Sequence, residues 1–301
     1  MLESIQSSID HKLILLTGAN GKTGHAIIRN LAARGASVRA LVRSPSSADT
    51  VAKLGAIPVI GNLRNDDDVD AAFEGVDRVY HLCPGLQPDD VEITQRMIRS
   101  AKDSRVKLFG YHSVSYPQLP EVAFHWKKLL SEIEILHSGL TFFIVRPCQY
   151  MQNVLWSLPA ILNEGVFALP WSADRRMVSV DVEDMGEAIA NILTRPGFEG
   201  GTYEFCSVKQ ALTRHEMAEM LGRAFNRKIV AGTRPIEKAL QAERFKHYTP
   251  EQLEQLGSLF KFFDLNGTPG FNNRTLAMIL GREPTSYEAF ARRLVQELNV
   301  N

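Results

Sequence analysis

Cysteine is scarce in this 301-residue sequence, with only Cys83, Cys148 and Cys206 present. An odd number at such wide spacing argues against a disulfide framework or a structural zinc site, and it favours a reducing compartment. The eight histidines and three cysteines show neither H-x-x-x-H nor C-x-x-C spacing. The sequence therefore offers no metal site.

The chain also lacks an excess of either charge, since 34 basic residues balance 34 acidic ones. This balance argues against electrostatic binding to nucleic acid or to an anionic membrane surface. No apolar run approaches the roughly 20 residues that span a bilayer. The first twelve residues have neither the basic start nor the apolar stretch of a signal peptide. We therefore expect a soluble cytoplasmic protein whose ligand is a small molecule.

The first half of the chain alternates short apolar runs with amphipathic helical patterns. The runs cover residues 12–17, 38–42, 57–60, 77–83, 106–113 and 140–145. Helical patterns follow several of them, including one with Trp126, Leu129, Leu130, Ile133 and Leu136 at helical spacing. Six strands joined by helical crossovers predict an α/β fold with a doubly wound parallel sheet.

The second half has a different rhythm. A helix over 181–193 is expected to pack back on the sheet, and residues 201–208 are expected to form a strand. Three Thr-x-x-Glu/Gln segments match the capping box that opens a helix, namely Thr213 to Glu216, Thr249 to Gln252 and Thr285 to Glu288. This region is therefore predicted to be mostly helical.

A glycine-rich turn, TGANGKTG at residues 17–24, joins the first strand to the first helix. Gly18 permits a tight turn, Gly21 lets a pyrophosphate approach the backbone, and Gly24 allows close helix packing. The helix N-terminus offers N–H groups and a partial positive charge to phosphates. We predict a dinucleotide site here, to which Asn20, Lys22 and Thr23 also contribute.

The end of the second strand indicates which dinucleotide binds. An NAD site places Asp or Glu there, whereas this chain has VRALVRSP with Arg39 and Arg43. Together with Lys22, Arg43 suits the 2′-phosphate of NADPH, while Arg39 is interpreted as a solvated strand residue. We expect a dinucleotide domain over 1–152, including a helix at 181–195, and a smaller substrate-binding region over 153–301.

These motifs resemble the NmrA-like group of atypical short-chain dehydrogenase/reductases. The similarity also rests on Asn62-Leu63 after the third strand, on HWKKLLSEIEILHSGLTFFIVRPCQYMQN from His125 to Asn153, and on the later GVFALP, VSVDVEDMGEAIANIL and GTYEF segments. It implies a Rossmann domain that prefers NADPH and a small C-terminal substrate domain. Some members reduce small molecules, and others bind the cofactor as redox sensors that regulate partner proteins.

The same resemblance places the group's active-site lysine at Lys128. The wider superfamily has Tyr four residues earlier, but this chain has Phe124, which cannot transfer a proton. Isoflavone-reductase-like enzymes also lack this tyrosine and rely on the lysine. His125 and Ser113 are further catalytic candidates, whereas His112 is expected in the core. Glu132 is expected to pair locally on the helix.

Residues at the carboxyl ends of the strands are expected to line the ligand crevice of a parallel sheet. Cys83, Pro84, Gly85 and Pro147 hold such positions and are predicted to contact the cofactor. Asn62, Leu63 and Lys128 are predicted to contact it as well. An aromatic-rich segment follows the sixth strand, and its side chains serve either the core or a pocket for an apolar or aromatic substrate. From this segment we single out Tyr150, Asn153 and Trp156 as substrate contacts.

Three functions remain open at this stage. The first is an NADPH-dependent reductase of a carbonyl, enone, imine or quinone-like molecule, with Lys128 or a bound water supplying the proton. The second is an NADPH-binding sensor that acts through a protein partner. The third is a non-redox isomerase or cyclase on the same scaffold, because a fold alone does not determine function.

Overall fold

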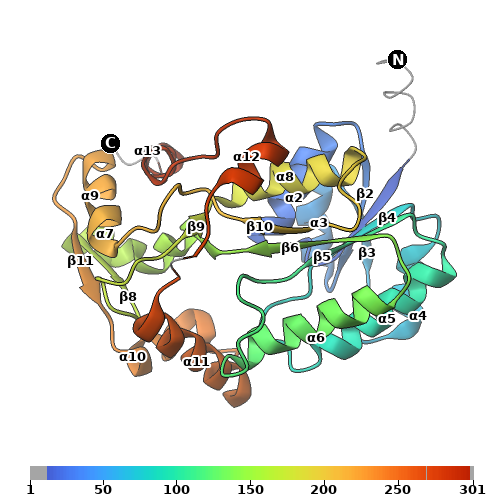
Figure 1. Ribbon diagram of the computed structural model, residues 1–301, viewed down its shortest axis with the longest axis horizontal. Helices are drawn as coiled ribbons and strands as arrows, with labels where there is room; N and C mark the ends of the chain where they lie inside the picture. The colour runs from blue at the N-terminus through green and yellow to red at the C-terminus, as the bar shows by residue number, and fades with distance from the viewer. Residues whose placement is uncertain (1–11, 269, 299–301) are drawn as a thin grey trace. The chain divides into compact units, whose positions relative to one another are not determined.

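A computed structural model describes residues 12–268 and 270–298 (Figure 1). The N-terminal segment that we interpreted from sequence lies outside this range, apart from its last residue. Residue contacts divide the chain into two units. The first unit holds the described residues up to Gln118, then Phe124–Pro147 and Met185–Tyr203. The second unit holds Leu119–Ala123, Cys148–Asp184 and the described residues from Glu204 onward. The domain boundary at residue 152 stays a prediction.

A seven-stranded sheet organises the first unit, with the strand order β10-β6-β5-β4-β1-β2-β3. The strands are β1 (Leu13–Leu16), β2 (Ser37–Val42), β3 (Ile57–Ile60), β4 (Arg78–His81), β5 (Leu108–His112), β6 (Phe142–Pro147) and β10 (Thr202–Phe205). The strand pairs from β3 through β6 are parallel. The predicted doubly wound α/β sheet is confirmed, and the strand expected over 201–208 joins its edge next to β6.

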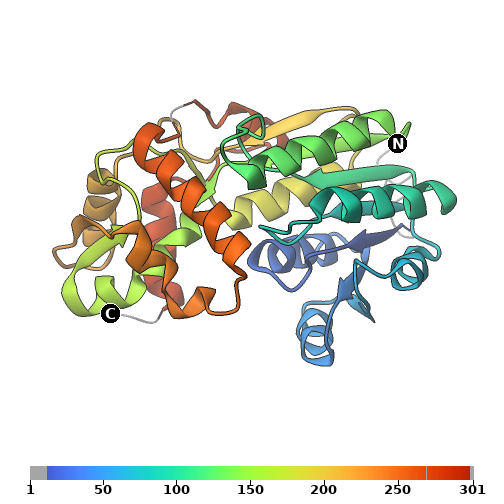
Figure 2. The ribbon, with the colours of Figure 1, turned by 90° about the horizontal axis from the view of Figure 1, so that it is seen from below.

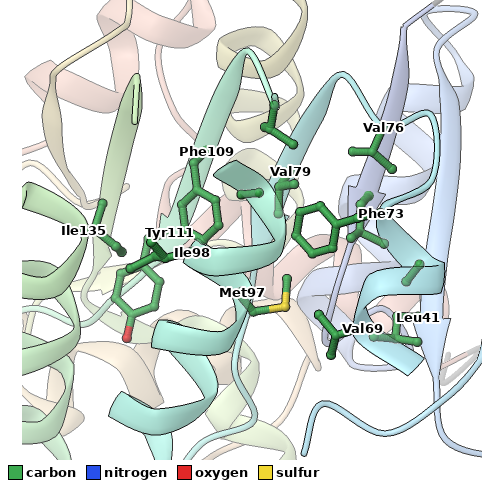
Figure 3. Close-up of a cluster of buried hydrophobic side chains, with 14 of the residues drawn as sticks. Leu41, Val69, Phe73, Val76, Val79, Met97, Ile98, Phe109, Tyr111 and Ile135 are labelled. Carbon is green, nitrogen blue, oxygen red and sulfur yellow. The ribbon is translucent and has the colours of Figure 1, made fainter. Parts of the chain in front are cut away.

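Helices cover both faces of this sheet (Figures 1 and 2). They are α2 (Lys22–Ala32), α3 (Pro45–Lys53), α4 (Asp66–Phe73), α5 (Asp90–Asp103), α6 (Ala123–His137) and α8 (Val182–Thr194). The core beneath α4, α5 and α6 is built from buried side chains such as Phe73, Val79, Met97 and Phe109 (Figure 3). Each buried apolar side chain contributes about 1.5–3 kcal/mol, so this core fixes the carboxyl ends of the strands.

Helix α6 packs in the opposite sense to the one its apolar pattern indicates. Trp126, Leu130, Ile133 and Leu136 are exposed, whereas the buried face carries His125, Lys128, Ser131, Glu132 and Ile135. Burying polar groups costs free energy unless they are hydrogen-bonded or paired. Here the buried charges are paired, as described below, and this pairing allows the polar face to turn inward.

The second unit contains short helices and two small parallel sheets. The strands pair as β7 (Gln149–Tyr150) with β9 (Ser179–Val180), and as β8 (Val166–Leu169) with β11 (Val230–Thr233). The helices are η1 (Met151–Ser157), α7 (Leu158–Glu164), α9 (Arg214–Ala224), α10 (Ile236–Leu240), η2 (Glu243–Phe245), α11 (Pro250–Asn266), α12 (Arg274–Leu280) and α13 (Tyr287–Glu297). The sequence predicted the helical content but missed these four short strands.

Two of the three predicted capping boxes are confirmed, at Thr213 for α9 and Thr249 for α11. The third is wrong by one residue, because Ser286 accepts the N–H of Ala289 at the start of α13. The Thr285 hydroxyl instead donates to Asp184 at 3.0 Å.

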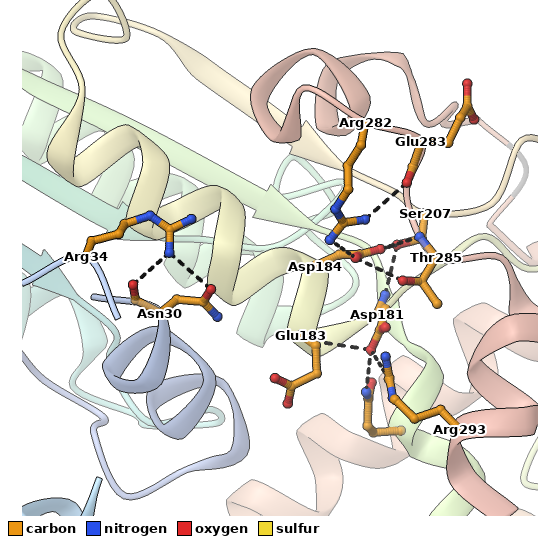
Figure 4. A network of polar contacts seen from close by, with 11 residues as sticks. Asn30, Arg34, Asp181, Glu183, Asp184, Ser207, Arg282, Glu283, Thr285 and Arg293 are labelled. Carbon is orange, nitrogen blue, oxygen red and sulfur yellow. Dashed lines mark hydrogen bonds and ion pairs between the residues drawn. The ribbon is translucent and has the colours of Figure 1, made fainter. Parts of the chain in front are cut away.

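Two buried carboxylates tie the remote segments of the second unit together (Figure 4). Asp184 also accepts from Arg282 at 2.9 Å, and Asp181 accepts from Arg293 at 2.8 Å and from Gln152 at 2.7 Å. Because charge-assisted hydrogen bonds are about twice as strong as neutral ones, these contacts anchor the C-terminal helices to the segment at 181–184.

Candidate functional site

The glycine turn has the backbone that a phosphate site needs. Gly18 has φ +63°, and an added Cβ would lie 2.6 Å from the carbonyl oxygen of Leu82. At Gly24 a Cβ would lie 2.5 Å from the carbonyl oxygen of Ala19, so the close approach there is to the turn itself rather than to the strand. At Gly21 a Cβ would meet only the Gly18 carbonyl oxygen, at 3.5 Å. Of the three glycines in this turn, Gly18 and Gly24 are therefore required by contacts with described residues, whereas Gly21 is not.

Gly21 is the N-cap of α2 and supplies no side-chain cap. The side chains of Asn20 and Lys22 are exposed, whereas Thr23 is buried. Since an uncapped helix N-terminus leaves N–H groups and a partial positive charge available, this turn suits an anion.

The first turn of α3 lies beside the glycine turn, because the Asn20 side-chain amide donates to the Ser47 hydroxyl at 3.0 Å. A short loop joins β2 to α3. Arg43 is exposed at the start of this loop. Ser44 caps α3, and its hydroxyl lies 3.1 Å from that of Ser46. The Arg43 cation and several hydroxyls thus gather at the beginning of α3. The sequence analysis predicted Arg43 but not the serines, although SPSS follows Arg43 directly.

Arg39 has a structural role rather than the solvated position we expected. Its guanidinium donates to the carbonyl oxygens of Ala72 at 2.9 Å and Glu74 at 2.6 Å. Arg39 therefore links the end of α4 to β2, and its guanidinium is directed to these carbonyl oxygens rather than to the glycine turn.

Other predicted cofactor residues lie just after β3 and β4 and at the last residue of β6. The Asn62 amide oxygen accepts the N–H of Arg64 at 3.1 Å, and Leu63 packs against the core of Figure 3. Burial raises the pKa of the Cys83 thiol, which fits its interpretation as a wall residue. Pro84 is half-buried, Gly85 is exposed and Pro147 is buried. Their contact with a cofactor stays a prediction.

Lys128 forms a buried ion pair that sequence reasoning did not find. Its ammonium lies 2.7 Å from the carboxylate of Asp90, and each side chain is only 3% exposed. The hydroxyls of Ser131 and Tyr111 donate to the same carboxylate at 2.7 and 2.8 Å. Lys128 also lies 5.2 Å from the centre of the Tyr111 ring.

These contacts hold Asp90 in its charged form. Burial alone raises the pKa of the Asp90 carboxyl, but the Lys128 charge and the hydrogen-bond donors outweigh it, so the pKa falls well below its usual value. Because loss of the Lys128 proton would leave this carboxylate buried without a counter-ion, the pair favours the ammonium form of Lys128.

A second polar group occupies the ends of β5 and β6. The Ser113 hydroxyl donates to the Glu132 carboxylate, which also accepts from the Arg146 guanidinium, with Nε at 3.0 Å. The expectation that Glu132 pairs locally on α6 is therefore wrong, because its partners are Arg146 on β6 and Ser113, which directly follows β5. Ser113 is buried and engaged in this network.

The buried histidines of the first unit are neutral at pH 7. Burial lowers the pKa of His125 to about 4, and its Nδ1 lies 3.1 Å from the Tyr116 carbonyl oxygen. Burial, reinforced by the Lys128 charge, lowers the pKa of His112 to about 3, and this residue is in the core as predicted. A neutral imidazole lacks the second proton, so His125 is disfavoured as the acid.

The predicted substrate residues all belong to the second unit. Tyr150 lines a small pocket described below, and Asn153 is half-buried. Trp156 packs edge-on against Phe245 and Phe260, with ring centres at 6.2 and 6.3 Å, and the Arg244 guanidinium lies 5.0 Å from its ring centre. Trp156 thus contributes to an aromatic core cluster.

Comparisons with known proteins show to which family the chain belongs. The family model described as the NmrA-like family matches residues 10–290. The chain belongs to the NmrA-like family. Its expected fold and family are therefore confirmed. An NAD(P)H azoreductase from Xenophilus azovorans is 27% identical over 282 residues, which covers 93% of this chain and 97% of that protein.

Solved structures resemble this member of the NmrA-like family along almost its whole length. The NADPH-dependent quinone oxidoreductase QOR2 of Escherichia coli, complexed with NADPH, gives a TM-score of 0.79 at 22% identity. Triphenylmethane reductase of Citrobacter sp., complexed with NADP(H), gives a TM-score of 0.76 at 21% identity. Each match covers 93% of this chain and 99% of the other. At such identities the likeness establishes the fold.

Two kinds of feature are absent from the described residues. Among residues 12–268 and 270–298, no group of three or more His, Cys, Asp or Glu side chains is arranged to hold a metal ion. Within the same described part of the chain, no helix has the length and apolar character to cross a membrane.

Proposed function

We propose that the protein is an NADPH-dependent reductase of a small, neutral aromatic acceptor such as a quinone. The observation that carries the proposal is the space at Gly21, where the chain itself has no need for glycine but an approaching pyrophosphate does. The names of the azoreductase, quinone oxidoreductase and triphenylmethane reductase point to the same reaction class.

The residues of the first unit fit such a cofactor. The N-terminus of α2 would hold the pyrophosphate, and Arg43 with Lys22 and the serines at the start of α3 would hold the 2′-phosphate. Bound NADPH supplies a hydride to the substrate.

The proposed role of Lys128 in this reaction is that of an ammonium group that stays charged throughout. A reduced carbonyl oxygen develops negative charge, which a preorganised ammonium stabilises. Because the pairing with Asp90 disfavours release of the Lys128 proton, we assign the proton on the new hydroxyl to water. Ser113 and Glu132 keep the ends of β5 and β6 in place.

A substrate panel tests the proposal. NADPH consumption is followed at its absorbance maximum with a naphthoquinone, a neutral azo dye and, as a cationic comparison, a triphenylmethane dye. Steady turnover with at least one of the two neutral acceptors is expected. Tight NADPH binding without turnover of any acceptor would replace this function by the cofactor sensor. Product formed at constant cofactor absorbance would replace it by the isomerase.

A further inference from the structure

A small pocket lies wholly within the second unit. It is lined by nine side chains, none of them charged at neutral pH: Gln149, Tyr150, Met151, Val154, Phe167, Leu169, Ser179, Met217 and Tyr287. They come from β7, η1, β8, β9, α9 and α13. Segments distant in sequence thus build one site of mixed apolar and hydroxyl or amide character, which selects a neutral ligand.

Two polar atoms in this pocket find no hydrogen-bond partner among the described residues. Gln149 Oε1 and Ser179 Oγ are both buried and make no hydrogen bond within the described part of the chain. Gln149 and Ser179 are register partners in the parallel pair β7–β9, so their backbones lie about 4.8 Å apart. A buried polar group without a hydrogen bond lowers stability by about 1–3 kcal/mol. Two such neighbouring atoms therefore indicate that a water molecule or a ligand atom binds between them.

The size and chemistry of the pocket restrict what that occupant is. Its free volume of about 10 Å³ suits one water-sized group. Gln149 Oε1 only accepts a hydrogen bond, whereas Ser179 Oγ donates or accepts. A hydroxyl satisfies both atoms by donating to Gln149 and accepting from Ser179, and a carbonyl oxygen accepts from Ser179.

The wall of the pocket favours an oxygen that carries partial negative charge. The Arg214 guanidinium lies 5.9 Å from the centre of the Phe167 ring, and it donates to the carbonyl oxygens of Trp171 at 2.8 Å and Gly232 at 2.6 Å. Arg214 is 3% exposed. Its charge therefore acts on the pocket through little intervening water.

We propose that this pocket binds the exocyclic oxygen of a neutral aromatic ligand, with Gln149 and Ser179 as the residues that recognise a quinone and its hydroquinone. The inference deepens the proposed function and rests on it for the identity of the ligand. Reduction of a quinone by NADPH and one proton yields a hydroquinone and NADP⁺, which turns an acceptor oxygen into a donor. The Gln–Ser pair accommodates both forms.

Binding of two ligands of equal size tests the pocket without any turnover. Calorimetry compares 2-naphthol with 2-methylnaphthalene, in which a methyl group replaces the hydroxyl. The unmodified protein is expected to bind 2-naphthol about 2- to 10-fold more tightly, as one or two neutral hydrogen bonds allow. Ser179→Ala and Gln149→Met should each reduce this preference. Equal affinities in the unmodified protein would overturn the proposal.

Ser157→Ala is the matched control. Ser157 is equally buried, but its hydroxyl accepts from the Ala168 N–H at 2.9 Å and donates to the Val166 carbonyl oxygen at 3.3 Å. Ser157→Ala should lower the melting temperature and leave the ligand preference unchanged. Ser179→Ala should leave the melting temperature unchanged and reduce the ligand preference. If Ser179→Ala lowers the melting temperature like the control and keeps the preference, the site holds a structural water only.

Kinetics separate this inference from the proposed function. With 1,4-naphthoquinone, Ser179→Ala should raise KM about 2- to 10-fold and change kcat little. If no quinone is reduced but the 2-naphthol preference and its loss in Ser179→Ala persist, the reductase function fails and the pocket stands. If quinone is reduced with the same KM in both proteins, the pocket assignment fails and the reductase function stands.

Discussion

The ion pair between Lys128 and Asp90 makes a sharp prediction about non-additive stability. Lys128→Met removes the ammonium and keeps much of the apolar stem, but it leaves the Asp90 carboxylate buried with only hydroxyl donors. Breaking a buried pair by removing one partner costs about 3–5 kcal/mol. Both side chains are only 3% exposed, so solvent screens this effect little. At about 2 °C per kcal/mol for a chain of this size, the melting temperature should fall by roughly 6–10 °C.

The double variant Lys128→Met/Asp90→Asn should be more stable than either single variant. It removes both charges, and the Asn side-chain oxygen still accepts from Tyr111 and Ser131. Replacing a buried pair by neutral groups of similar volume is often neutral in stability. The double-mutant cycle therefore predicts a strong coupling between the two sites. Calorimetric unfolding of the four proteins measures it, and losses that simply add would refute the pairing argument.

The stability of the pair also depends on pH. The pKa of Asp90 is lower in the folded protein than in the unfolded chain, where it is about 3.9. Its stabilisation is thus fully present above that unfolded value and disappears as the pH falls toward the folded one. The difference in melting temperature between the parent and the Asp90→Asn single variant should accordingly shrink between pH 6 and pH 3. A constant difference would contradict the charged state of Asp90.

Three further predictions concern the cofactor and the proton. Gly21→Val should abolish NADPH binding in calorimetry. The melting temperature should stay within about 1 °C, because a Cβ at position 21 makes only an ordinary contact at 3.5 Å with the Gly18 carbonyl oxygen. Unchanged NADPH affinity would show that the turn has a structural role only. Arg43→Ala should weaken NADPH binding about 10- to 100-fold and NADH binding little, as loss of a charge-assisted phosphate contact implies; equal losses would remove Arg43 from the 2′-phosphate site. The kcat should stay level between pH 6 and 8, because the pKa of His125 is about 4; a titration near 6.5 would restore a histidine acid.

The fold was predictable because its signals are local. Six apolar runs of strand length and the glycine turn all appear in the structure close to their expected places. The short strands of the second unit, such as β7 with two residues, were not predictable, since two residues carry no periodicity. Thr285 shows a similar limit, because its capping pattern is sound but a tertiary contact with Asp184 engages its hydroxyl.

The candidate site was predictable only in part. The turn at Gly18–Gly24 and Arg43 follow a pattern of spacing, and Lys128 follows the resemblance. Asp90 gave no such signal, since it looks like one of many acidic residues at the start of a helix, and its partner lies 38 residues further along the chain.

One physical reason explains why the sequence did not predict the buried face of α6 or the pocket of the second unit. Pattern reading assigns apolar side chains to the interior, which holds where burial is governed by the hydrophobic effect alone. On α6 the buried face is polar because Lys128 and Glu132 find partners on α5 and β6. In the second unit the buried Ser179 hydroxyl makes no hydrogen bond with any described residue. Each position contradicts the local pattern, and each lies where chemistry or ligand recognition is proposed. Deviations from apolar patterning are therefore informative in this chain, because a polar group is kept in the interior only if a partner or a ligand compensates it.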